Sequence, residues 1–334
     1  MPRLALKANL LSRFEGAMKL SGWNLLYLTK DSHPARYRVF KDGRGELVRV
    51  YIWNISHGGG ERRSKYEYRI QITGFARFEP EPNGRTLILG WWEDAGVFAG
   101  WDYRQHLGEL GKSPSMQVSE SALRNALLFG FAPYKRQNGE TAIAFRPDFA
   151  GTYVEFLEEL HDSGSIPEEE RVLDKLSNDP EDVSENDIDV AVGETRKYAI
   201  MSTKRALRAN DFSRRVLGVY QYRCAMCQTQ LQLIDGAHIV PVEHSGSDQT
   251  SNGIALCALH HRAYDSSLVT FDQDFNVLIN EPIVEKLKTS ELAGGLDAFV
   301  ENLRPMISIP TDKKDQPRPE YVTEANKLRG WISV

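Results

Sequence analysis

All three cysteines of this 334-residue chain, and four of its eight histidines, fall between Cys224 and Asp265. Cys224 and Cys227 form a C-x2-C pair, and Cys257 and His260 form a C-x2-H pair. Zinc favours thiolate and imidazole ligands in a tetrahedron, commonly supplied as two short pairs. We therefore predict a structural Zn²⁺ site, which would hold together two stretches of chain that lie about thirty residues apart.

Simple burial and a disulfide are the alternative interpretations of these cysteines. Three thiols that are merely buried would not all stand at ligand spacing. A Cys224–Cys227 disulfide is disfavoured, because residues 1–12 carry no secretory signal and a reducing cytoplasm, where disulfides are rare, is the expected location. The fourth zinc ligand stays open between His260 and its neighbour His261.

Three further motifs lie in the same segment. The chain reads Ala-His-Ile-Val-Pro around His238, Ser-Asn-Gly around Asn252, and His-His-Arg-Ala-Tyr-Asp up to Asp265. Together with the cysteine pairs, these motifs resemble the HNH endonuclease family, whose core is a ββα-metal fold. The resemblance covers residues 210–275, about a fifth of the chain.

The resemblance implies a role for each of these polar residues. His238 would be the general base that takes a proton from the water attacking a phosphodiester, and Asn252 would fix the loop and orient that base. His261 and Asp265 would bind Mg²⁺ or another divalent ion. The chemistry is consistent, because histidine titrates near neutral pH, a hard cation polarises phosphate, and positions i and i+4 share one helical face.

One position departs from the family pattern. Many members carry Asp or His directly before the base, as a further metal ligand, but this chain has Ala237. Asp235 lies two residues earlier, so both side chains face the same side of a strand. Asp235 could replace the missing ligand, or it could be an ordinary aspartate at a strand end or turn.

Charge is unevenly distributed along the chain, although the whole carries only −5. Residues 163–194 contain eleven acids and two bases, whereas residues 195–223 contain eight bases and one acid. A basic stretch next to a nuclease segment suits contact with a phosphate backbone, and an ordinary solvated helix face is the alternative. The expected DNA-binding residues here are Arg205, Arg208, Arg214 and Arg215.

Length and composition predict two domains and no membrane span, because no run of eighteen apolar residues occurs. The expected fold is α+β: a recognition domain over residues 1–162 with a twisted, largely antiparallel sheet, an acidic linker over 163–194, and a ββα-metal nuclease domain with a zinc knuckle over 195–334. Helices are expected at 4–21, 119–129, 152–161, 210–220, 256–264 and 316–331, and strands at 36–40, 47–55, 67–73, 86–92, 96–101 and 141–145.

The first domain has no Asp…Glu-x-Lys arrangement, so it is expected to read DNA rather than cut it. A glycine loop after Trp53 is flanked by His57, Arg62 and Arg63, and glycines allow close approach to phosphate or base; a flexible hairpin turn is the alternative. Trp92 and Trp101 are candidates for a pocket that holds a flipped base, or else for a sheet core.

These observations predict a restriction-type DNA endonuclease of the cytoplasm that acts on double-stranded DNA. Whether the target carries a modified base is left open, and so is a homodimer, which cutting both strands would favour. The alternatives are a non-restriction HNH nuclease of the mobile-element or toxin-like kind, and a catalytically silent zinc protein that binds DNA.

Overall fold

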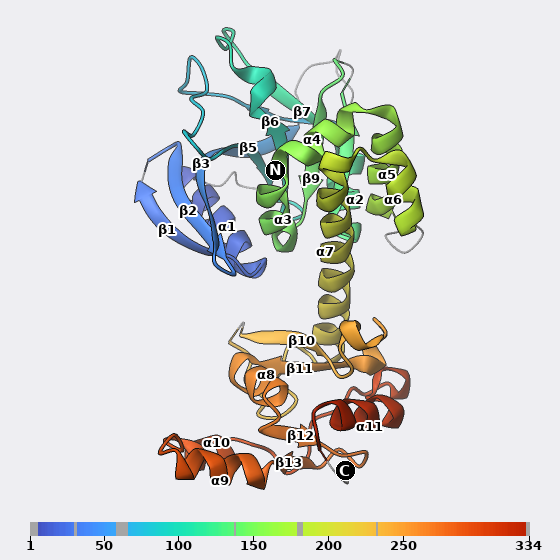
Figure 1. Cartoon of the computed structure of the whole chain (residues 1–334). Coiled ribbons are helices and arrows are strands. Elements are labelled where there is room, and N and C mark those ends of the chain that lie inside the picture. Colours follow the sequence, from blue (N-terminus) through green and yellow to red (C-terminus); the bar gives the residue numbers. More distant parts are fainter. Residues whose placement is uncertain are drawn as a thin grey trace. The chain divides into compact units, whose positions relative to one another are not determined.

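The structure is a computed structural model that describes residues 6–29, 32–57, 66–136, 138–178, 183–231 and 233–331. The chain divides into two compact units, Met1–Leu207 and Arg208–Val334, and each is described by itself (Figure 1). Both units combine helices with sheets, so the predicted α+β class is confirmed.

A nine-stranded sheet organises the first unit. Its main path has the order β1-β2-β3-β5-β6-β9-β8, and β4 and β7 form a side branch that pairs with β3. Every pairing is antiparallel except β3 with β5. The strands are β1 (Asn24–Thr29), β2 (Ala35–Lys41), β3 (Arg44–His57), β4 (Glu67–Gln71), β5 (Arg85–Trp92), β6 (Val97–Asp102), β7 (Ser115–Ser119), β8 (Phe131–Lys135) and β9 (Thr141–Phe145).

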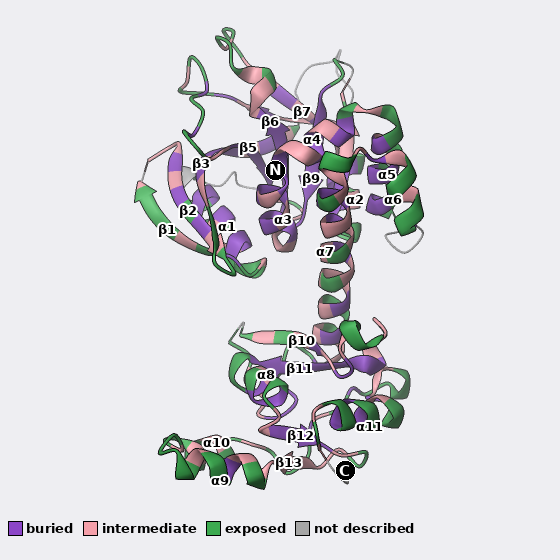
Figure 2. Cartoon of the chain, viewed as in Figure 1, coloured by how far each residue is buried: buried purple, intermediate pink, exposed green. Residues whose placement is uncertain are grey.

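Both faces of this sheet are covered, and strand alternation sorts the side chains between them. Strand β5 is buried along most of its length (Figure 2). Its Leu89 and Trp91 belong to one hydrophobic core, whereas Ile88 and Trp92 belong to another. Helices α1 (Lys7–Leu20), α3 (Ala150–Glu155) and α4 (Leu157–Ser165) supply the first core, and α2 (Glu120–Phe129) with β4 and β7 supplies the second.

Because both faces of the sheet are covered, Trp92 and Trp101 do not line an open pocket. Trp92 is 4% exposed and Trp101 is fully buried, with its indole N–H donating to the Gln117 carbonyl at 3.1 Å. Neither ring is available to stack on a base, so the core alternative is the correct one. His57 is exposed at the end of β3, while Arg62 and Arg63 lie outside the described residues.

The acidic segment 163–194 was expected to be a linker, and the structure differs. Two helices, α5 (Pro167–Asn178) and α6 (Glu185–Ala191), pack their apolar side chains into the first core. The acids occupy the outer faces, so a high average charge conceals an amphipathic pattern. The buried Glu169 accepts hydrogen bonds from Arg196, at the start of α7 (Glu194–Val219), at 2.7 and 2.8 Å. The unit boundary therefore falls within α7, after Leu207.

The second unit is built on a small ββα element. Strands β10 (Ile234–His238) and β11 (Gly253–Cys257) pair antiparallel, and α8 (Ala258–Asp265) follows directly and contacts both strands (Figure 1). A core around Ile254, Leu256 and Tyr264 lies beneath. The remaining elements are β12 (Val269–Phe271), β13 (Val277–Ile279), α9 (Glu281–Thr289), α10 (Leu296–Glu301) and α11 (Pro319–Leu328).

Within the described part of the chain, none of the helices combines the length and the apolar character needed to cross a membrane.

The packing of α5 can be tested by removing one side chain. Leu173 is fully buried, so Leu173→Ala should lower the free energy of unfolding by about 2–5 kcal/mol, as large-to-small core substitutions do. Val190→Ala on α6, where the side chain is 81% exposed, is the control and should change stability by less than about 0.5 kcal/mol. Calorimetry of the full chain would measure both, and equal melting profiles would contradict the packed arrangement.

Candidate metal centre and active site

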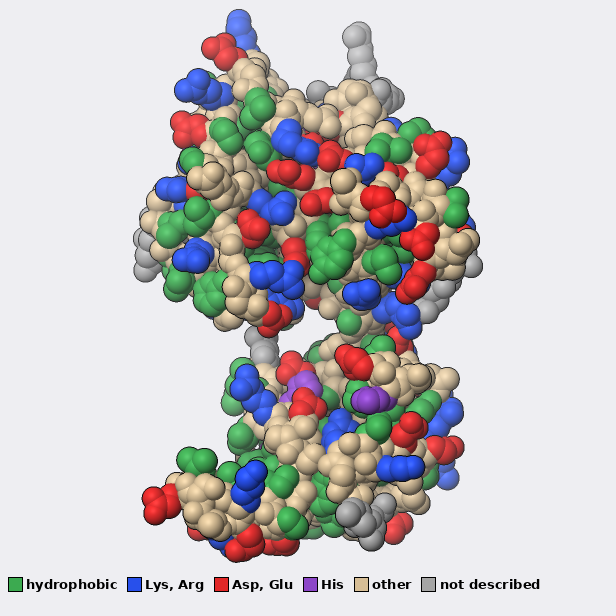
Figure 3. Space-filling model, viewed as in Figure 1, with side chains coloured by type: hydrophobic (Ala, Val, Ile, Leu, Met, Phe, Trp, Pro, Cys, Tyr) green, Lys and Arg blue, Asp and Glu red, His purple; other side chains and the backbone are tan. Residues whose placement is uncertain are grey.

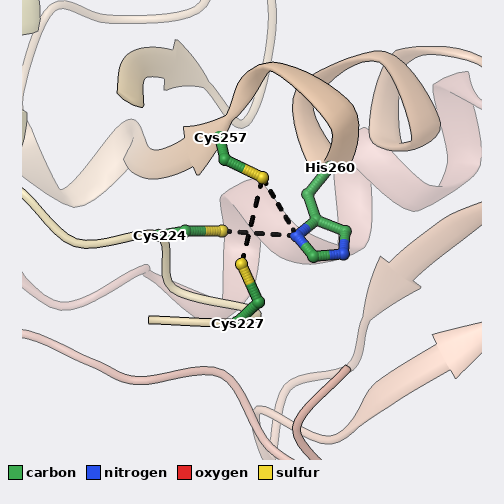
Figure 4. A group of neighbouring side chains, drawn as sticks. All are labelled: Cys224, Cys227, Cys257 and His260. Atoms are coloured by element: carbon green, nitrogen blue, oxygen red, sulfur yellow. Dashed lines mark hydrogen bonds between the residues drawn. The ribbon is translucent and has the colours of Figure 1, made fainter. Parts of the chain in front are cut away.

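Three short segments bring the predicted zinc ligands together (Figure 4). Cys224 and Cys227 lie in the turn after α7, Cys257 ends β11, and His260 lies in the first turn of α8. The Ala225 N–H donates to the Ala255 carbonyl at 2.7 Å, which fixes the cysteine turn against β11. The quartet is thus positioned by backbone hydrogen bonds as well as by its own contacts.

The geometry of the quartet fits a tetrahedral metal ion. The four donor atoms lie within 4.8 Å of one another. The Nδ1 atom of His260 is 3.4 Å from Cys224 Sγ and 3.3 Å from Cys257 Sγ, and Cys227 Sγ is 3.9 Å from Cys257 Sγ. Tetrahedral zinc bonds would separate two sulfurs by about 3.8 Å, and a sulfur from a nitrogen by about 3.5 Å. These four residues could therefore hold zinc.

The protonation of the quartet agrees with this assignment. Burial lowers the pKa of His260, so its ring is neutral at pH 7 and its Nδ1 can donate a lone pair. Burial raises the pKa of the Cys224 thiol to about 12. A bound cation would reverse that shift, because a coordinating thiol is deprotonated. His260, rather than its neighbour His261, faces the cysteines.

His238 closes β10 and contacts two groups that sequence reasoning missed. Its Nε2 lies 2.9 Å from Oδ1 of Asp248, and its ring stacks on Phe212 of α7 with centroids 3.7 Å apart and planes 7° apart. Arg208 donates to the other carboxylate oxygen of Asp248 at 2.7 Å. Neither Asp248 nor Phe212 belongs to a motif, and only folding brings them to the strand end.

Asn252 fixes the loop between the two strands. Its side-chain oxygen accepts from the Val240 N–H at 2.9 Å, and its amide donates to the carbonyls of Val240 and Ser247 at 3.0 and 2.8 Å. The side chain is fully buried, so all of these bonds serve the loop. Gly246 is required in the same loop, since a Cβ there would lie 1.8 Å from the Val240 carbonyl oxygen.

His261 gathers the remaining predicted ligands on the exposed side of α8. Its Nδ1 lies 3.3 Å from Asp235 and its Nε2 lies 3.6 Å from Asp265. The hydrogen bond with Asp235 raises the pKa of His261. Arg329, another residue without a motif, lies 3.8 Å from Asp265 and donates to the Ile239 carbonyl at 2.9 Å. Asp235 is thus beside His261, although Ala237 offers no ligand.

Several basic residues of α7 pair with acids of the protein. Arg208 pairs with Asp248, while Arg214 and Arg215 both pair with Asp211 at 3.0 and 2.7 Å. Arg205 is exposed. Figure 3 shows cationic and acidic side chains interspersed over the visible face rather than separated into a patch of one sign. Three of the four arginines predicted to contact DNA therefore form ion pairs within the protein.

The metal quartet predicts a sharp stability effect. Cys224→Ser should abolish stoichiometric zinc binding and the cooperative unfolding of the second unit, because structural zinc contributes about 10–16 kcal/mol of apparent binding energy. Zinc analysis of the purified protein and a thermal melt would measure this, with the exposed His244→Ala variant as the control that keeps its zinc. A zinc-free Cys224→Ser protein with an unchanged melt would contradict the site.

Two protein families match this chain, one within each of its two units. Residues 224–272 match the model of a family described as HNH endonuclease, and residues 46–154 match a family described as Methylase-associated X1. No curated protein matches. Among solved structures, the chain has 11% identity to a "Modification dependent TagI restriction endonuclease", over 85% of this chain and 82% of that chain, with a TM-score of 0.31. Residues 224–272 are an HNH endonuclease domain, and the chain is a nuclease.

Proposed function

We propose that this nuclease is a restriction-type DNA endonuclease, in which the second unit cuts and the first unit selects the target. The observation that carries the proposal is the combination in one chain of an HNH domain with a separate 207-residue unit. The candidate base His238 and the candidate metal ligands Asp235, His261 and Asp265 all lie in the second unit. A first unit of this size, with its own two-sided core, is consistent with target selection.

The proposed reaction is hydrolysis of a phosphodiester. His238 takes one proton from a water molecule, the water oxygen bonds to phosphorus, and one P–O ester bond breaks. The leaving oxygen takes a proton from solvent, and His238 later returns its proton to solvent. Asp235, His261 and Asp265 are the candidate ligands for Mg²⁺ or another divalent ion, which when bound would polarise the phosphate and neutralise negative charge.

The target is proposed to be double-stranded DNA whose modification state is read by the first unit. Residues 46–154 match a family described as methylase-associated, which suits a unit that distinguishes modified from unmodified DNA. His57 and Arg205 are exposed candidates for DNA contact, and Arg62 and Arg63 remain candidates from the sequence. Because each chain has one HNH domain, cutting both strands would favour a homodimer.

A panel of DNA substrates tests the choice of target. Unmodified, methylated, hydroxymethylated and phosphorothioated duplexes of one sequence would be incubated with the full chain and Mg²⁺, Mn²⁺ or EDTA. We expect metal-dependent cutting that differs at least tenfold between modified and unmodified duplexes. Equal cutting of every duplex would instead support a non-restriction nuclease of the mobile-element or toxin-like kind.

The general base is tested on whichever duplex is cut. His238→Ala should lower the single-turnover rate by about 10²–10⁴, the usual contribution of general base catalysis, and should leave DNA affinity and zinc content unchanged. His244→Ala, a histidine exposed in the same loop, is the matched control and should cut at the wild-type rate. Wild-type cutting by His238→Ala would exclude His238 as the base. DNA binding without cutting by the unaltered chain would favour a silent zinc protein.

A further inference from the structure

We infer that Asp248 is the positioning residue of the general base, and that Arg208 on α7 holds Asp248 in place. This inference rests on the proposed function, because it assumes that His238 acts on water. Asp248 lies in the loop after β10, ten residues beyond His238, and no motif includes it. Its assignment comes from the contacts made around the His238 ring.

The hydrogen bond between the two side chains determines which ring nitrogen is the base. Oδ1 of Asp248 lies 2.9 Å from Nε2 of His238, and both side chains are about four-fifths buried. An ionised carboxylate only accepts hydrogen bonds, so Nε2 must carry the hydrogen. In the neutral ring the lone pair is then on Nδ1, and Nδ1 is the atom that takes the proton from water.

Phe212 limits the remaining freedom of the base. Its ring lies parallel to the imidazole, with 3.7 Å between centroids and 7° between planes. Phe212 is itself 1% exposed in the core of the second unit. The hydrogen bond to Asp248 therefore fixes the rotation of the His238 imidazole within its plane, while stacking on Phe212 fixes the orientation of that plane. A base held in this way loses little freedom when the reaction begins.

Arg208 determines the orientation of the Asp248 carboxylate. It donates to Oδ2 of Asp248 at 2.7 Å, while Arg215 donates to the Asp248 backbone carbonyl at 2.9 Å. Both arginines come from α7, so this helix supports Asp248 from its side chain and its backbone. The sequence predicted that these arginines contact DNA, and the structure places both of them against Asp248.

This arrangement predicts the effect of an isosteric change. In Asp248→Asn the Arg208 guanidinium would select the amide oxygen, which turns the amide N–H toward His238. An N–H donor facing the ring favours a lone pair on Nε2 and places the hydrogen on Nδ1, so the wrong nitrogen is protonated. The corresponding change in a serine-protease triad lowers kcat by about 10⁴. For this partly exposed pair we expect a fall of about 10²-fold in the single-turnover rate, with DNA affinity unchanged.

The experiment compares full-length Asp248→Asn, Asp248→Glu and the exposed control Asp297→Asn in single-turnover cleavage of the duplex found in the panel. Asp248→Glu should recover part of the rate, and Asp297→Asn should match wild type. Adding Asp248→Asn to His238→Ala should cause no further loss, because the carboxylate acts only through the ring. A further tenfold loss in that double variant would indicate a structural role and overturn the inference.

The ring tautomer provides a readout that does not depend on cleavage. Long-range ¹H–¹⁵N spectra of the wild-type chain, with the His238 signals assigned by their loss in His238→Ala, should show the hydrogen on Nε2. In Asp248→Asn they should show it on Nδ1. A wild-type ring protonated on Nδ1 would overturn the inference even where Asp248→Asn folds poorly. An inactive His238→Ala with a fully active Asp248→Asn would overturn the inference alone, whereas an active His238→Ala would overturn the proposed base.

Discussion

The convergence of Cys224, Cys227, Cys257 and His260 is the constraint on which the second unit depends. The ββα element is short, with five-residue strands and an eight-residue helix, and elements of this size are marginal without a staple. The quartet ties the turn after α7 to the junction between β11 and α8. His261 and Asp265 follow on the same helix, so the position of these candidate catalytic ligands depends on the position of the quartet.

Successive strand positions explain how a base and a metal site can share this element. Side chains alternate across β10, so His238 faces Phe212 while Ala237 and Asp235 face the other way. Asp235 then reaches His261, which α8 presents together with Asp265. Many family members have a metal ligand at the position of Ala237. In this chain Asp235, two residues earlier on the same face of the strand, lies beside His261. The geometry is consistent with a displaced ligand.

Local patterns predicted most of the elements, and long-range packing decided the rest. The strand at Thr141–Phe145 was predicted with its observed bounds, because its pattern is local. The two zinc-ligand pairs were predicted from their local spacing with His261 left as the alternative to His260, and only the fold brings Cys224, Cys227, Cys257 and His260 together. The strands β1, β7 and β8 were not predicted, since they are short and their register comes from partner strands. Residues 163–194 were taken for a linker because net charge concealed the apolar face of α5. Trp101 shows the same limit, because alternation cannot tell whether a second layer covers the outer face of a sheet.

The charges on α7 show why a basic run is a weak guide to a binding surface. Eight bases over residues 195–223 predict a strong field, yet acids from elsewhere in the chain lie against several of them: Glu169 beside Arg196, Asp248 beside Arg208. The fields of two opposite charges in contact largely cancel at a distance. Only the excess of positive over negative charge therefore attracts a polyanion. A phosphate that drew Arg208 away from Asp248 would also release the carboxylate that we propose orients His238. DNA binding and base orientation would then compete for one arginine, so the contacts that hold DNA for cutting are better sought elsewhere than at Arg208.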